Sequence, residues 1–68
     1  MKMHKIYAYT QEHYEQIAQF VYDNYKELHT VETTGITRII HVKLSKHNAQ
    51  IVAAYALALE HTFSKRGN

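Results

Sequence analysis

Histidine is the residue type with the widest chemical potential in this chain, because imidazole can ligate a metal ion or exchange a proton near neutral pH. Six histidines occur among the 68 residues: His4, His13, His29, His41, His47 and His61. A zinc site needs three or four ligands in matched geometry. No two of these histidines stand four residues apart, and no His-x-His pair occurs. The spacing therefore favours scattered histidines and predicts no metal site.

Patterns that support catalysis are also sparse. Glu12 and Glu15 share one face of an expected helix, a spacing that is common on solvated helices. The only serines are Ser45 and Ser64, and Ser45 is better explained as a helix cap. The chain has no glycine-rich phosphate loop, no nucleophile elbow and no cysteine. We therefore expect no catalytic residues, no cofactor and no enzymatic activity.

Basic and aromatic residues alternate with apolar ones along two expected strands. In the first strand, Ile6 and Ala8 point to one side of the sheet, so their neighbours point to the other. In a later strand, Ile40, Val42 and Leu44 are the expected core side. The other face then collects the candidate residues for binding a nucleic acid or another partner, which are Lys5, Tyr7, Tyr9, Ile39, His41 and Lys43, with Arg38 and Lys46 nearby.

Three interpretations of this face remain open. Tyr7 and Tyr9 suit half-buried strand positions, where aromatic residues are favoured. Tyrosine is also enriched in protein interfaces, so the face is a candidate for dimerisation. A sheet that displays aromatic rings among basic side chains is also typical of proteins that bind single-stranded nucleic acids, by base stacking and phosphate contacts.

The elements that position these residues are marked by caps and a turn. Thr10 is a suitable N-cap with Glu12 in the first helical turn, and Ser45 is the expected N-cap of a second helix. Gly35 within Thr33–Ile36 predicts a tight hairpin turn. The expected elements are a strand at His4–Tyr9, a helix from Thr10 to about Leu28, strands at His29–Thr33 and Ile36–Leu44, a helix at Lys46–Phe63, and a frayed tail at Ser64–Asn68.

This order predicts a single α+β domain over residues 1–68. Two helices and three strands in the order β-α-β-β-α are most simply arranged as a two-layer sandwich. We expect a three-stranded antiparallel sheet with both helices on one face.

The second helix holds an unusually apolar segment. Ala49–Leu59 contains one polar side chain, Gln50, and no charge. One of its stripes can pack in the protein's own core, and consists of Val52, Ala56, Leu59 and Phe63. A second stripe lies on a different side and is the candidate oligomer interface: Ile51, Tyr55, Ala58 and Thr62. So short a chain lacks the core to cover both stripes, and oligomerisation commonly supplies the missing cover.

Charge is unevenly distributed along the chain. The formal net charge is +2, but Thr10–His29 carries −3 and the remainder +5, an asymmetry that favours self-association. The apolar segment is too short for a membrane span, which needs about 20 residues. No signal peptide is recognisable, and the absence of cysteine suits the cytoplasm.

We therefore expect a small, non-enzymatic interaction or regulatory module that acts as a cytoplasmic homodimer and binds another macromolecule, with no membrane association. Its protein partner is not identified by the sequence. Chains of this size are common among accessory and inhibitor proteins of phages and mobile elements. The alternative is a nucleic-acid-binding dimer that uses the basic and aromatic face of the sheet.

Overall fold

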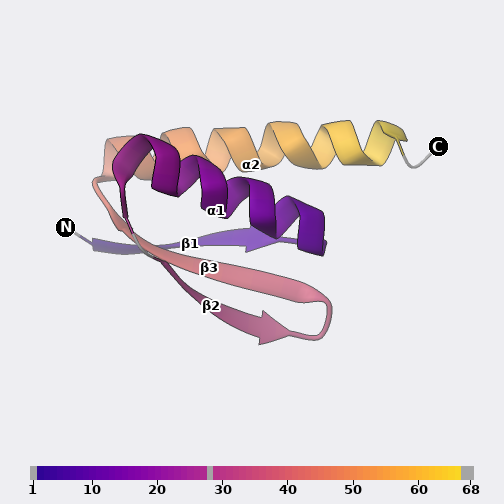
Figure 1. The fold of residues 1–68 in the computed structure, drawn as a ribbon, viewed down its shortest axis with the longest axis horizontal. Helices are drawn as coiled ribbons and strands as arrows, with labels where there is room; N and C mark the ends of the chain where they lie inside the picture. The colour runs from indigo at the N-terminus through magenta and orange to yellow at the C-terminus, as the bar shows by residue number, and fades with distance from the viewer. Residues whose placement is uncertain (1, 28, 67–68) are drawn as a thin grey trace.

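A computed structural model describes residues 2–27 and 29–66. The order strand, helix, strand, strand, helix and the α+β class are confirmed (Figure 1). The elements are β1 (Lys2–Ala8), α1 (Gln11–Tyr25), β2 (His29–Thr34), β3 (Thr37–Leu44) and α2 (Lys46–Arg66).

The sheet has the order β1-β3-β2, and both pairings are antiparallel. Ile40 on the central strand β3 lies between Ile6 of β1 and Val31 of β2. Both helices lie on one face of this sheet, and the hairpin end of β2 and β3 reaches away from them (Figure 1). β1 and β2 are therefore the two edge strands, and one whole face of the sheet has no helix over it.

The N-caps and the hairpin follow the sequence closely. The Thr10 hydroxyl accepts from the His13 amide at 3.0 Å, and the Ser45 hydroxyl accepts from the Asn48 amide at 3.2 Å. Gly35 has φ +61° at the first position of a two-residue turn, where a type II′ hairpin favours glycine. The second hairpin strand begins at Thr37, one residue after its expected start.

Other boundaries differ from the expected ones. α1 ends at Tyr25 because Lys26 adopts the left-handed conformation and its amide donates to the Tyr22 carbonyl; Leu28 lies outside the described residues. α2 continues through Arg66, so the expected fraying after Phe63 is wrong for 64–66, whereas 67–68 lie outside the described residues. β1 spans Lys2–Ala8 and does not include Tyr9.

The core lies between the helices and the β1–β3 part of the sheet. The predicted inward faces of both strands are confirmed, since each of the expected side chains is buried. The sheet contributes Ile6, Ala8, Ile40, Val42 and Leu44, and the helices contribute Ile17, Val21, Ala49, Val52 and Ala56.

His13 is a polar side chain inside this core, with 2% of its surface exposed. Its Nε2–H donates to the carbonyl oxygen of Ala56 at 2.9 Å, since a carbonyl can only accept. Its Nδ1 accepts from the amide of Tyr9 at 3.3 Å. The imidazole and the Phe63 ring pack in an edge-to-face arrangement, with their centroids 5.7 Å apart. One neutral imidazole thus joins the end of β1, the first turn of α1 and the middle of α2.

We expect His13→Leu to lower the free energy of unfolding by about 2–3 kcal/mol, because a partly buried amide and a buried carbonyl each lose a partner. Urea denaturation measures this change. Gln16→Ala, at an exposed position of the same helix, is the control and should change stability by less than about 0.5 kcal/mol. Equal stability of the two variants would show that the imidazole does not hold the elements together.

Candidate interaction surfaces

The uncovered face of the sheet collects side chains that alternate with the core residues. Antiparallel pairing places Met3 opposite Lys43, Lys5 opposite His41, and Tyr7 opposite Ile39. We call these six residues the open sheet face. Five of them are predicted partner-binding residues, which the structure brings together on neighbouring strands: Lys5, Tyr7, Ile39, His41 and Lys43.

The other three predicted residues lie elsewhere. Tyr9 follows the end of β1, where the chain has left the sheet, and its ring lies beside the buried His13 with the centroids 6.0 Å apart. Arg38 alternates in phase with the core residues of β3, and its guanidinium donates to the Ile36 carbonyl at 3.4 Å. Lys46 is the first residue of α2, on the helix layer. None of the three belongs to the open sheet face.

The open sheet face is mildly basic. Lys5 and Lys43 are exposed there, and Glu32 of β2 supplies the neighbouring carboxylate. That carboxylate accepts from Nε2–H of His41 at 3.2 Å, so its charge is held beside the central strand β3. The helix layer carries the opposite sign on α1, through exposed acidic residues at Glu12, Glu15 and Asp23. The two layers therefore present different charge to solvent.

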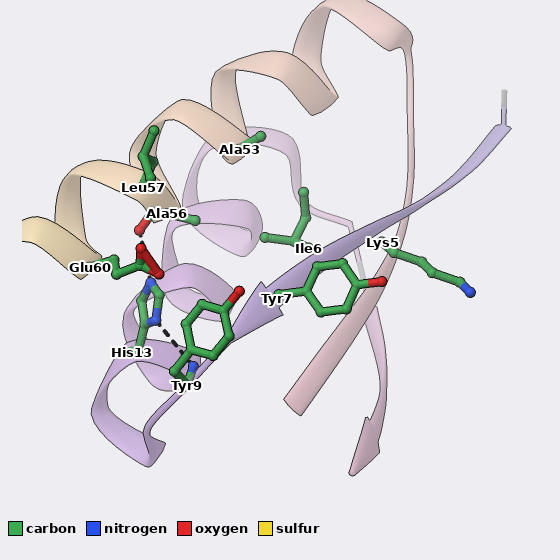
Figure 2. Close-up of a pocket in the computed structure, with 9 residues that line it drawn as sticks. All are labelled: Lys5, Ile6, Tyr7, Tyr9, His13, Ala53, Ala56, Leu57 and Glu60. Atoms are coloured by element: carbon green, nitrogen blue, oxygen red, sulfur yellow. Dashed lines mark hydrogen bonds between the residues drawn. The ribbon is translucent and has the colours of Figure 1, made fainter. Parts of the chain in front are cut away.

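A second surface runs along the edge strand β1. An open groove of about 220 Å³ separates this strand from α2. Figure 2 shows Ile6 pointing towards α2 between Ala53 and Ala56, with Leu57 further along the helix. Leu57 is 56% exposed and Tyr7 is 46% exposed. The groove and its rim form an apolar strip beside unpaired strand backbone, which we call the β1–α2 edge (Ile6, Tyr7, Ala53, Leu57 and Glu60).

Ala53 and Leu57 are not among the interface residues predicted above, although their spacing in the sequence places them on one flank of the helix. Residues on this flank of α2 repeat at alternating intervals of four and three, the spacing of a coiled-coil seam. The seam consists of Lys46, Gln50, Ala53, Leu57, Glu60 and Ser64. Its two apolar members lie at the centre, and its charged members lie near the ends.

The stripe expected to need a second copy is partly covered inside the chain. Phe20 of α1 stacks on Tyr55, with ring centroids 4.1 Å apart and planes 13° apart. The expectation that the Tyr55 ring lacks cover within its own subunit is therefore wrong. Ile51 is 40% exposed, Ala58 is exposed, and the exposed Thr62 donates its hydroxyl to the Ala58 carbonyl at 3.1 Å. An interface at this stripe stays a prediction.

Two further findings concern the described residues only. Across 2–27 and 29–66, no helix is long and apolar enough to cross a membrane. In the same part of the chain, no three His, Asp or Glu side chains are grouped closely enough to hold a metal ion.

No protein-family model, curated protein or solved structure matches this chain. The two surfaces described above are therefore the basis for proposing its function.

We expect Tyr55→Ala to lower the free energy of unfolding by about 1–3 kcal/mol, since it removes a half-buried ring and its stacking. Phe20→Ala should show the same direction, and the double variant should cost less than the sum of the two single variants. Thermal unfolding measures the stability, and light scattering measures the mass of each variant. If Tyr55→Ala changes the mass and leaves the stability unchanged, the Tyr55 ring packs on a second copy of the chain and not on Phe20.

Proposed function

We propose that the protein is a small, non-enzymatic interaction module that acts as a homodimer, joined at the β1–α2 edge, and that the dimer binds another macromolecule. The observation that carries the proposal is the unpaired backbone of β1 beside the exposed Leu57. An edge strand offers a row of free amide and carbonyl groups to another strand. The non-enzymatic role rests on the sequence, which holds no catalytic motif.

The register of β1 supports pairing with an identical strand. A two-fold axis perpendicular to the sheet makes the two β1 strands antiparallel and leaves both helix layers on the same side. With the axis at Ile6, Lys5 of each copy lies opposite Tyr7 of the other, where an ammonium group can interact favourably with an aromatic ring. With the axis at Lys5, two like charges would lie directly opposite, which is destabilising. The Ile6 register is therefore favoured over the Lys5 register.

The seam on α2 is compatible with the same axis. Ile6 and Ala53 line the same groove, so a two-fold axis beside Ile6 also runs beside Ala53 and makes the two α2 helices antiparallel neighbours. Lys46 and Glu60 each lie seven residues from Ala53 along the seam. Antiparallel helices that cross near Ala53 therefore bring Lys46 of one copy towards Glu60 of the other. The small side chain of Ala53 permits close approach, and Leu57, which is exposed in the single chain, then lies beside Gln50 of the other copy and loses contact with water.

Cysteine cross-linking tests this geometry directly, because the chain contains no cysteine. Ala53 and Ala58 are both exposed on α2 but lie on opposite flanks of the helix. Under mild oxidation we expect Ala53→Cys to form a disulfide-linked dimer at least tenfold faster than Ala58→Cys, as read on a non-reducing gel. Faster cross-linking through Ala58→Cys would move the interface to the Ile51–Thr62 stripe and contradict the β1–α2 edge.

Light scattering then tests whether the edge holds the dimer in solution. We expect the wild type to have twice the mass of one chain, and Leu57→Glu to weaken the dimer at least tenfold, because each copy would then place a carboxylate in the contact between the helices. Ile51→Glu, on the other flank of α2, is the matched control and should leave the dimer intact. A wild type that stays monomeric at high concentration would refute the proposal.

A further inference from the structure

The proposed dimer makes the two open sheet faces continuous. Two three-stranded sheets joined through β1 give one sheet of six strands, with neighbouring strands about 4.8 Å apart. In the Ile6 register, Lys5 and Tyr7 of both copies occupy the centre of the joint face. His41 flanks each Lys5 and Ile39 flanks each Tyr7 on the next strand outward. Basic and aromatic side chains that are few on one copy thus become a single central group.

We propose that this joint face binds single-stranded nucleic acid; the inference rests on the proposed homodimer and names the class of its partner. Unpaired bases stack on exposed aromatic rings, each such contact contributing several-fold or more to affinity, while lysines contact the phosphates. In the single chain Tyr7 is an exposed ring, and Lys5 on its own strand and Lys43 on the next strand supply the ammonium groups. Met3 and Ile39 add apolar surface around the two rings.

The charges on the other elements support this choice of partner. Glu32 of β2, two strands outward from Lys5 and Tyr7 of β1, is engaged by His41. The acidic residues of α1 lie on the opposite layer, so a polyanion is attracted to the sheet and repelled from α1. A flat sheet also suits splayed single-stranded bases better than a duplex, whose grooves are usually read by an inserted helix or narrow ribbon.

Fluorescence anisotropy tests the inference with labelled oligo-dT and oligo-U of about 15 nucleotides at about 50 mM salt, where phosphate contacts are strong. We expect the wild-type dimer to bind at least one of them more tightly than a duplex of equal length. Binding of oligo-dT alone, of oligo-U alone or of both supports the site and shows whether the ligand is DNA, RNA or either. Failure to bind either strand, or tighter binding of the duplex, would overturn the inference.

Lys43→Gln and Lys65→Gln form a matched pair of variants, since each removes one exposed lysine and neither residue lies in β1. Lys43 lies on the open sheet face, whereas Lys65 is at the end of α2. We expect Lys43→Gln to weaken binding about three- to tenfold and to reduce the salt slope, whereas Lys65→Gln changes neither. Equal losses of affinity in the two variants would show that the oligonucleotide responds only to the net charge of the protein, and would overturn the site.

The failure of the inference is distinguishable from the failure of the proposed dimer, because light scattering on the same samples reports mass. A dimer that does not bind oligonucleotide refutes the inference and leaves the proposed dimer standing. A monomeric wild type refutes the proposed dimer, and with it the joint face. Leu57→Glu should weaken oligonucleotide binding by separating the two faces, and unchanged affinity in this variant would also refute the joint face.

Discussion

The rigid ring of His13 makes hydrogen bonds to two backbone groups: Nδ1 accepts from the amide of Tyr9, and Nε2–H donates to the carbonyl of Ala56. Since the ring cannot stretch, these hydrogen bonds fix the distance between the end of β1 and the middle of α2. They also fix which flank of α2 follows the strand. Ala53 and Ile6 therefore line the same groove, and Leu57 lies exposed along the same edge. The outward surface of the protein at β1 depends on a contact made in its core.

The number of elements sets a second constraint. Two helices placed on one face of a three-stranded sheet leave the other face and both edge strands without cover. The uncovered regions differ in chemistry, because the β1–α2 edge is apolar beside free backbone and the open sheet face mixes lysine, tyrosine and histidine. An apolar edge favours a permanent protein contact, whereas a polar face stays soluble until a ligand arrives. The proposed dimerisation and the proposed ligand binding therefore use two different surfaces, which meet at Tyr7.

The sequence predicts the fold well because its signals are local. Strand alternation, the Thr10 and Ser45 caps and the Gly35 turn each depend on a few neighbouring residues. The end of α1 is not predictable in this way, since lysine seldom adopts the left-handed conformation that Lys26 has. Tyr9 leaves the sheet because its amide bonds His13, a contact that alternation cannot reveal. Five of the six residues of the open sheet face are accordingly predicted from the sequence, and the sixth, Met3, is missed because the expected strand begins at His4 whereas β1 begins at Lys2.

The interface on α2 was harder to predict because alanine is spread over every flank of the helix. Periodicity separates two stripes, but it cannot show that Phe20 on α1 covers Tyr55. With that ring covered, the most exposed large apolar side chain among the described residues of α2 is Leu57, on the seam beside β1. Lysine on an edge strand usually discourages pairing with other chains. Lys5 discourages pairing selectively. In the proposed dimer it disfavours a register that places the two lysines face to face, and it permits the register in which each lysine lies opposite Tyr7 of the other copy. In the proposed dimer, the side chain that protects the edge from indiscriminate pairing thus also disfavours the register centred on Lys5.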